Sequence, residues 1–469
     1  MGIEKVINEQ EKEYASKYGF NDKIKYEEAI KGLSEDTVKR ISKLKGEPDW
    51  MLQKRLDALR IFQGKPMPKW GPNLDEIAFE DIYYYLDPLK GKAAKWDDLP
   101  ADIRRTLEKL NVPKNEQKMF LGTEAQYDSK VVYNSINKQL EEKGVIFIST
   151  DEAVKKYPDL VKKYFGTVIP ASDNKFAALN TAVWSGGSFV YVPKGVKLQM
   201  PLEAYFRINA EKAGQFERTL IIAEEGSEVT YMEGCTAPIY SSASLHSAVV
   251  EIIAHKNAKV TYITIQNWSK NVYNLVTQRA HAYEGAYVRW IDGNIGSKVN
   301  MKYPSVFLRE KGAKGEIISV AVAGNNQVQD SGGKVYHLAP DTSSKIVSKS
   351  ISSGNGTSVF RGLVHVAKAA MRSQSAVRCD ALILDDNAKA DTYPYMEILA
   401  DDATTVHEAT VGKIGEDQLF YLMSRGLSEE EATTLIVMGF LQEFTEALPA
   451  VYSLELRRLI SLDMSKAVG

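Results

Sequence analysis

The 469-residue sequence contains only two cysteines, Cys235 and Cys379. A disulfide framework is not expected at this density, and no C-x-x-C pair completes a metal site within the local sequence. Without further information each thiol is interpreted as a buried structural group, because free cysteine packs as a small hydrophobic residue. Chemistry at either thiol would need ligands from elsewhere in the chain or from a partner.

Long apolar runs and an excess of one charge are also missing. The longest apolar stretch near the C-terminus is "LIVMGFL" at 435–441, far below the roughly 20 residues of a membrane-spanning helix. The N-terminus, "MGIEKVINEQEKEY", is charged from its fourth residue and does not resemble a secretory signal. The formal net charge of −2 argues against a nucleic-acid binder. We therefore expect a cytoplasmic protein with neither nucleic acid nor a membrane as a partner.

Short catalytic motifs are absent as well. The sequence has no G-x-x-x-x-G-K-[ST] loop for nucleotide phosphates, no G-x-S-x-G nucleophile elbow and no H-E-x-x-H zinc helix. Any ligand chemistry must therefore come from residues that are scattered along the chain.

What the sequence does contain divides it into three regions. Residues 1–165 combine helical patterns with Pro- and Tyr-rich connectors, and we expect a mostly helical region there. Residues 166–410 alternate short strands with Gly, Asn and Asp turns, and residues 411–469 return to a helical period. In the first region Ser34, followed by two acidic residues, predicts a helix N-terminus.

The middle region carries a repeated turn-then-strand unit, seen in "AEEGSEVTY", "AHKNAKVTY", "AYEGAYVRW" and "REKGAKGEI". Its turn residues are Gly226, Asn257, Gly285 and Gly312. The stretches 384–392 and 400–408 resemble the same unit. Gly and Asn tolerate the positive φ of a tight corner, and a period of about 30 residues is typical of a solenoid. We predict a mainly β fold, a parallel β-helix-like solenoid with helical regions at both ends, and a β-sandwich is the structural alternative.

The C-terminal region predicts a helical hairpin. Gly426 suits the end of one helix, and Ser428 with Glu431 three residues later forms a capping box for the next. Pro449 ends that helix. The apolar residues between 427 and 444 are too numerous for a free hairpin. They need a cover, either the protein's own solenoid or a partner interface.

The segment after Cys379 collects residue types that bind metals. Cys379 is followed by seven acidic residues and then by His407 and Glu408. Thiol, imidazole and carboxylate together suit iron or zinc. Adjacent residues on a strand face opposite sides, so His407 and Glu408 cannot both point at one ligand without a bend. Either this grouping is a coincidence, or a second subunit supplies the missing ligands.

Longer motifs resemble one known family. They are "YMEGCTAP", "AVVEIIAHKNAKVTYITIQNW", "VTQRA", "MKYPS", "CDALILDD", "HEATVGKIGEDQLFYLMSRGLSEEEA" and "LIVMGF". Together they closely resemble, over nearly the whole chain, the SufB/SufD family of the SUF iron–sulfur cluster assembly machinery. The presence of both "EGCTAP" and the "CD…HEAT" pair favours the SufB branch over the SufD branch, which shares the fold.

The resemblance implies roles for particular residues. Cys235 matches a cysteine that accepts persulfide sulfur, and Cys379 matches the cysteine at a heterodimer interface where the nascent cluster is expected. Glu408 matches a proposed cluster ligand, with His407 beside it. The residues matched to a sulfur path inside the β-helix are Arg207, Asn209, Gln266 and Trp268.

Two positions depart from the family pattern. Gln278 stands where a basic residue often precedes the arginine of "VTxRA", which puts a role in guiding an anionic persulfide in doubt. Val406 stands where an acidic residue often precedes the histidine of "HEAT", so a ligand is not expected there.

The resemblance also implies cofactors and partners. It implies a scaffold rather than an enzyme, with ATP hydrolysis supplied by a SufC-type ABC ATPase that docks on the C-terminal region. A SufD subunit or a second SufB copy, a cysteine desulfurase or its sulfur carrier, and apo iron–sulfur proteins complete the expected partners. The expected cargo is a nascent iron–sulfur cluster of the [4Fe-4S] type, and a role for reduced flavin stays open. A persulfide is easily lost to water or oxidant, so carriage inside a solenoid would protect it.

Two other interpretations stay open. One is a SufD-like structural partner without sulfur chemistry. The more remote one is a β-helix polysaccharide lyase or hydrolase, which would use clustered carboxylates among the acids at 385–402.

Overall fold

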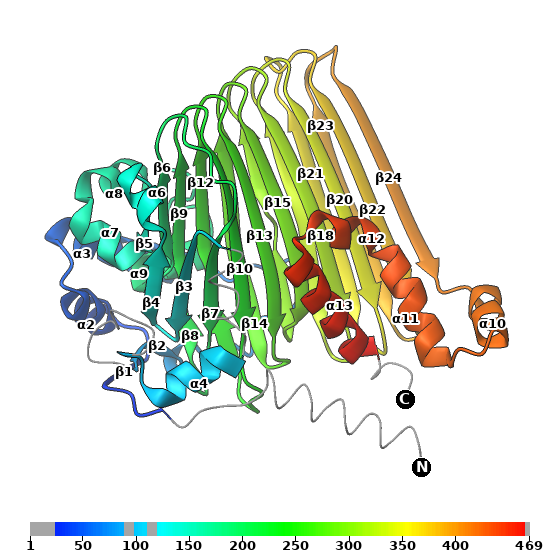
Figure 1. Cartoon of the computed structure of the whole chain (residues 1–469), viewed down its shortest axis with the longest axis horizontal. Coiled ribbons are helices and arrows are strands. Elements are labelled where there is room, and N and C mark those ends of the chain that lie inside the picture. Colours follow the sequence, from blue (N-terminus) through cyan, green and yellow to red (C-terminus); the bar gives the residue numbers. More distant parts are fainter. Residues whose placement is uncertain (1–23, 89–97, 110–119, 465–469) are drawn as a thin grey trace.

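The computed structural model describes residues 24–88, 98–109 and 120–464, and a two-sheet parallel β-solenoid forms its centre (Figure 1). The chain alternates between the two sheets, so each coil adds one strand to each sheet. The strands of the ten-stranded sheet, in spatial order, are β24 (Thr404–Lys413), β22 (Gln374–Ile383), β20 (Ser343–Ser352), β18 (Lys314–Ala323), β15 (Tyr287–Gly296), β13 (Lys259–Trp268), β10 (Glu228–Thr236), β7 (Leu202–Arg207), β3 (Gly122–Tyr127) and β4 (Lys130–Ile136).

The second sheet lies opposite the first. Its main path is β23 (Lys389–Ile398), β21 (Thr357–Val366), β19 (Val328–His337), β16 (Val299–Lys302), β14 (Val272–Ala282), β12 (Val249–Ala254), β9 (Arg218–Ala223), β6 (Ser188–Val192) and β5 (Ile146–Ser149), with β17 (Ser305–Leu308), β11 (Ser244–His246) and β8 (Gly214–Gln215) beside it. Only β3–β4 and β5–β6 pair antiparallel within the two sheets as described. The parallel solenoid is confirmed, and the β-sandwich alternative is wrong.

One corner of the solenoid is the turn column predicted from the repeat. Gly226, Asn257, Gly285 and Gly312 all have positive φ, between 57° and 72°. The amide of Gly226 donates to the carbonyl of Lys256 in the next coil at 2.8 Å, and the other three turns repeat this bond. The stretch 400–408 leads into β24 of the same sheet, as the alignment expected. The stretch 384–392 leads into β23 of the other sheet, so it lies at the opposite corner.

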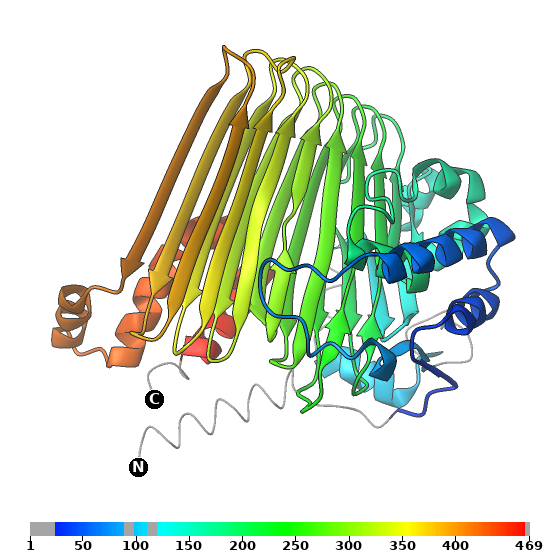
Figure 2. The same ribbon diagram turned by 180° about the vertical axis from the view of Figure 1, so that it is seen from behind.

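The N-terminal region closes one end of the solenoid with strands as well as helices. Its helices are α2 (Glu35–Lys45), α3 (Asp49–Gly64), α4 (Ala101–Lys109), α6 (Lys138–Glu142), α7 (Thr150–Lys156) and α8 (Pro158–Tyr164), with a 3-10 turn at Phe79–Asp81. Strands β1 (Glu28–Lys31) and β2 (Tyr83–Asp87) form a separate antiparallel pair. The predicted cap at Ser34 is confirmed, since its side chain accepts from the amide of Thr37. Figure 2 shows α3 packed at this end, beside the second sheet.

One helix was not expected within the strand-rich region. The nine residues of α9 (Lys175–Val183) are capped by Asn174, whose side chain accepts from two backbone amides. Every residue of α9 from Phe176 onwards is buried. A helix covered on all sides has no polar face, so its sequence shows no helical period to detect.

The C-terminal helices are α10 (Glu416–Ser424), α11 (Glu429–Phe440), α12 (Gln442–Ala447) and α13 (Ala450–Met464). The predicted capping box of Ser428 and Glu431 is present. Helices α11 to α13 lie on the outer face of the ten-stranded sheet, where Val437, Leu441 and Phe444 pack on its isoleucines (Figure 1). The chain's own sheet therefore covers part of the hairpin. None of the described helices is both long and apolar enough to cross a membrane.

Candidate functional site

Cys235 lies on β10 and faces the solenoid interior, the space between the two sheets. Side chains alternate along this strand: Tyr231 and Cys235 pack in the interior core, whereas Met232 packs under the C-terminal helices. The thiol is 1% exposed. Its Sγ donates to Oε1 of Glu233 at 3.4 Å.

Two carboxylates surround this thiol. Ligand atoms of Glu217, Glu233 and Cys235 all lie within 4.8 Å of one another. Glu217 is bonded to Nε2 of His246, and Glu233 accepts from the hydroxyl of Tyr262. Burial, followed by the Glu233 and Glu217 charges, raises the pKa of Cys235 well above its ordinary value. The thiol is therefore neutral near pH 7 in this conformation.

Gln266 and Trp268 lie on the next strand, β13, and share this interior. Cys235 pairs in register with Gln266. Oε1 of Gln266 accepts from Nε1 of Trp268 at 3.0 Å and from Nδ2 of Asn274 at 2.5 Å. Asn274 contacts Nδ1 of His246 at 2.6 Å. One polar network therefore joins two of the predicted path residues to the carboxylates beside Cys235.

Arg207 and Asn209 are buried but lie outside this network. Arg207 pairs with Thr236, the neighbour of Cys235 that faces the other side of the sheet, and Nη1 donates to its hydroxyl at 3.0 Å. The backbone amide of Asn209 donates to Asp128 at 2.7 Å, near the corner of the solenoid. The structure thus brings Gln266 and Trp268 together with Cys235, and places Arg207 and Asn209 elsewhere.

Cys379 lies on β22, also in the interior core, and is 4% exposed. The strand registers place it in one inward row with Glu233. The members of this row, one per strand, are Glu233, Thr264, Asp292, Ser319, Ser348 and Cys379. Five strand spacings correspond to about 24 Å. The two cysteines therefore face the same interior. Cys379 is the last member of this row, and Cys235 lies two residues after Glu233, its first member.

His407 and Glu408 are separated by the alternation of β24, as the sequence predicted. Nε2 of His407 lies 3.6 Å from Sγ of Cys379. Glu408 contacts this sulfur only through its backbone carbonyl, at 3.6 Å. Its carboxylate is on the outer face, in a pocket of about 210 Å³ with Lys345, Arg378 and Glu443. Burial and then Asp380 raise the pKa of Cys379 to about 11, against a smaller lowering by Thr392.

The acids after Cys379 are not gathered at one place. Asp385 and Asp386 precede β23, whereas Asp401 and Asp402 follow it. The ten residues of this strand span about 33 Å. Asp385 accepts from the amide of Gly354, and Asp402 accepts from that of Arg372. These acids stabilise opposite corners, so they do not form the carboxylate pair that a glycan-cleaving site requires.

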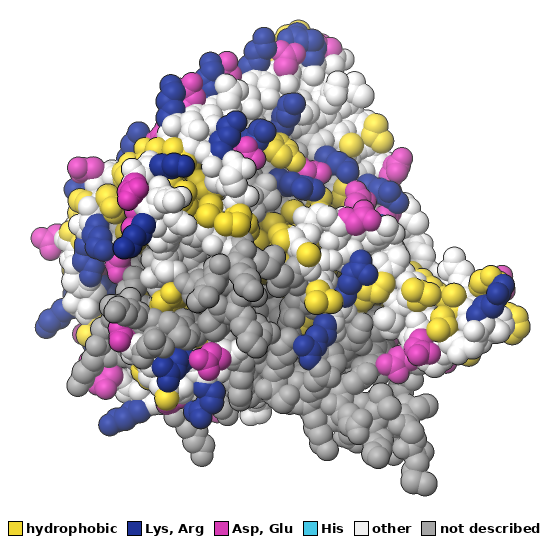
Figure 3. Space-filling view, viewed as in Figure 1, with side chains coloured by type: hydrophobic (Ala, Val, Ile, Leu, Met, Phe, Trp, Pro, Cys, Tyr) yellow, Lys and Arg dark blue, Asp and Glu magenta, His cyan; other side chains and the backbone are white. Residues whose placement is uncertain are grey.

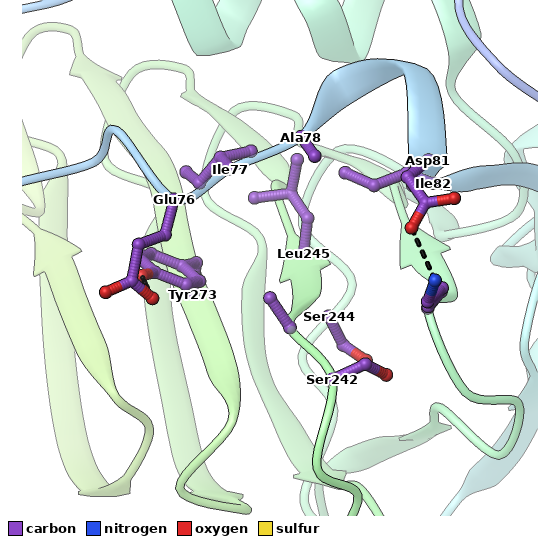
Figure 4. Close-up of a pocket in the computed structure, with 11 residues that line it drawn as sticks. Glu76, Ile77, Ala78, Asp81, Ile82, Ser242, Ser244, Leu245 and Tyr273 are labelled. Carbon is purple, nitrogen blue, oxygen red and sulfur yellow. Dashed lines mark hydrogen bonds and ion pairs between the residues drawn. The ribbon is translucent and has the colours of Figure 1, made fainter.

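Two further surface pockets contain neither cysteine in their lining. A pocket of about 250 Å³ is lined by Glu76, Asp81, Leu245 and Tyr273, and contains none of the predicted site residues (Figure 4). A pocket of about 430 Å³ is lined in part by Gln278, whose two amide atoms have no hydrogen-bond partner within the described residues.

Two profiles of known protein families match most of the chain. The profile described as "SUF system FeS cluster assembly, SufBD core domain" matches residues 206–440. The profile described as "SufBD protein N-terminal region" matches residues 45–204. The chain belongs to the SufBD family. Iron–sulfur cluster assembly SufBD family proteins of Staphylococcus haemolyticus (strain JCSC1435) and Staphylococcus aureus (strain USA300) are each 55% identical to it over 454 residues, 97% of this chain and 98% of each relative.

Sequence reasoning missed the polar groups that surround Cys235 in this SufBD chain. Glu233 was within reach, because a residue two positions before Cys235 on a strand must share its face. Glu217 and His246 lie on the side of the second sheet and approach Cys235 from across the interior. No local sequence pattern connects them to this thiol.

Proposed function

We propose that this SufBD protein is a SufB-type scaffold, which receives persulfide sulfur at Cys235 and builds an iron–sulfur cluster near Cys379. The single observation that carries the proposal is that both thiols face one interior. The row between them is polar and buried, with Thr264, Asp292, Ser319 and Ser348 on successive strands. A reactive sulfur anion moving along it would stay away from bulk water and oxidant.

Glu233 suits the first step. A thiolate attacks the terminal sulfur of the donor's persulfide, the donor's S–S bond breaks, and the donor leaves as a thiolate. Cys235 must first lose its proton, and its Sγ already donates to Glu233. Glu233 would take that proton as a general base. The donor, a cysteine desulfurase or its sulfur carrier, has to open a path, because the thiol is buried.

The cluster would form at the open end of the solenoid. Strands β23 and β24 each have a neighbour on one side only. Cys379 and His407 are one thiol and one imidazole, too few ligands to hold a cluster alone. A SufD subunit or a second copy of this chain, docked against these edges, would supply further ligands. Glu408 would join them only after a change in β24 that turns its carboxylate inward.

The exposed part of the C-terminal helices suits an ATPase partner. Helix α10 has no buried residue, and Phe420 on it is 75% exposed. Figure 3 shows hydrophobic side chains gathered on this protruding end. We propose that a SufC-type ABC ATPase docks here and supplies the ATP hydrolysis for a chain that acts as a scaffold. Its closure would pull on α10 and the adjoining β24, and so rearrange the open end.

The cargo is proposed to be a [4Fe-4S] cluster that is passed to apo iron–sulfur proteins. Reduced flavin would serve as an electron source for this assembly. Thiolate and imidazole ligands from a weakly closed site would hold the cluster loosely enough to release it.

Anaerobic reconstitution tests the proposal with two sulfur sources. With iron and free sulfide, Cys379→Ala should abolish the cluster absorption and Mössbauer signal, whereas Cys235→Ser should keep them. With a cysteine desulfurase as the only source, both substitutions should abolish the cluster. His407→Ala and Glu408→Ala rank the other ligands, and we expect the larger loss for His407→Ala.

The SufD-like alternative makes the opposite prediction for Cys235. Unchanged cluster yield from the desulfurase with Cys235→Ser would establish a structural partner and reject the scaffold role. A cluster that survives Cys379→Ala would place the assembly site elsewhere in the chain.

A further inference from the structure

We propose that Glu217, Glu233 and Cys235 form a binding site for a divalent transition-metal ion inside the solenoid, separate from the cluster site near Cys379. This site shares Cys235 and Glu233 with the sulfur-acceptor step proposed above, and the experiment below tests metal binding alone, without a sulfur donor.

The geometry of the three groups suits a small metal ion. Their ligand atoms lie within 4.8 Å of one another before any ion is bound. Metal–ligand bonds of about 2.0–2.3 Å place the ligand atoms of a tetrahedral site about 3.3–3.8 Å apart. Small side-chain rotations therefore close the site. The ligands come from β10 and from the segment just before β9, so an ion would join the two sheets.

The charge around the site calls for a cation. Glu217, Glu233 and Cys235 are all at most 2% exposed. His246 is bonded to Glu217, and Nζ of Lys302 is bonded to Asp292 at 2.5 Å. Glu233 is left without a cationic side chain bonded to it among the described residues. Buried carboxylates normally have a cation or a metal ion beside them.

Unpartnered polar atoms around the site provide a second observation. Among the residues that the structure describes, Oε2 of Glu217, Oγ1 of Thr264 and Nε2 of Gln266 have no hydrogen-bond partner, although all three side chains are at most 1% exposed. Thr264 and Gln266 pair in register with Glu233 and Cys235, on the same face of the sheet. Oε2 of Glu217 suits direct coordination, and the other two suit a water bound to the ion.

The donor set selects the class of ion. One thiolate with two carboxylates favours Fe²⁺, Co²⁺ or Zn²⁺ over Mg²⁺ and Ca²⁺, which prefer oxygen alone. Three protein ligands leave the fourth position open, which is typical of a working site rather than a closed structural one. His246 is bonded to Glu217 and would hold its carboxylate in place, as residues that contact a ligand but not the ion do in metal sites.

Cobalt binding to a chain with a single thiol tests the proposal. The Cys379→Ser chain retains only Cys235, so a sulfur-to-cobalt charge-transfer band reports this thiol alone. The chain is produced in medium with Co²⁺, without added sulfide, which removes any limit from access to the buried site. We expect one cobalt per chain and the thiolate band. The absence of that band in the folded Cys379→Ser chain overturns the proposal.

Carboxylate variants in the same background complete the test. Glu217→Gln and Glu233→Gln should each weaken cobalt binding at least about tenfold. Glu203→Gln is the matched control, since Glu203 is equally buried but accepts from Tyr452 on the outer face. Equal affinity in all three variants contradicts the site. Should a variant not fold, X-ray absorption of the Cys379→Ser chain decides: one sulfur at about 2.3 Å with oxygens at about 2.0–2.2 Å supports it, and oxygens alone reject it.

Discussion

The two ends of the solenoid place a cysteine in different surroundings. At the end closed by the N-terminal region, Cys235 lies among Glu217, Glu233 and His246, all of them buried. At the other end Cys379 lies beside His407, and only β24 follows it in its sheet. The strand registers at the two cysteines are alike. The difference in their surroundings therefore comes from the number of coils that follow each strand. A solenoid can thus keep one polar site sealed and present another at its edge.

Matched histidine substitutions should separate the two ends most strongly. His246→Ala leaves the carboxylate of Glu217 buried without its partner, which costs about 3–5 kcal/mol in free energy of unfolding. His407→Ala removes a half-buried ring with one weak contact to a thiol, and we expect about 1 kcal/mol or less.

Urea unfolding of the metal-free variants measures both values. His246→Gln, which keeps a polar group near Glu217, should recover part of the loss. Equal losses for His246→Ala and His407→Ala would mean that the two ends are equally sealed.

The fold could be predicted from the sequence because its signals are local. The corner residues from Gly226 to Gly312 need positive φ, and the capping box at Ser428 follows from spacing alone. Helix α9 was missed because its burial on all sides removes the helical period. The stretch 384–392 was aligned with the wrong corner, since both corners use the same small polar residues.

The site was predictable only in part. The resemblance selected both cysteines, and alternation separated His407 from Glu408 correctly. The same alternation, applied from Cys235 to its pairing partners, needs the strand register, which the sequence does not contain. Arg207 could therefore not be assigned to the outer side of the sheet, and Glu217 could not be linked to the thiol.

Thiol reactivity should distinguish the ends next. Burial and Asp380 raise the pKa of Cys379 to about 11, so at pH 8 its alkylation should be about a hundredfold slower than that of an exposed cysteine. The rate should rise about tenfold per pH unit up to pH 10, because the thiolate is the nucleophile. Cys235 is buried more deeply and its pKa is raised well above its ordinary value, so it should react more slowly still.

The raised pKa of Cys379 also makes the stability of the fold depend on pH. The folded pKa of Cys379 lies above that of the unfolded chain, so the contribution of this thiol to the free energy of unfolding is complete below about pH 8.5 and is lost as pH rises towards 11.

Iodoacetamide labelling with peptide mass spectrometry measures the alkylation rates of both thiols in one sample. Faster labelling of Cys235 than of Cys379 would reverse the assignment of sealed and open ends.

Charges placed on the open edge should change stability least and association most. Tyr395 and Val406 are 57% and 51% exposed on β23 and β24, so Tyr395→Lys and Val406→Lys should alter the free energy of unfolding by no more than about 0.5 kcal/mol. Lysine on an edge strand opposes pairing with another chain, so each should weaken any self-association or SufD binding, measured by light scattering, at least about tenfold. Leu44→Lys, an exposed apolar position at the closed end, is the matched control and should leave association unchanged. Weaker association only with Leu44→Lys would move the interface to the closed end, and with it the place where a partner would complete the proposed cluster site.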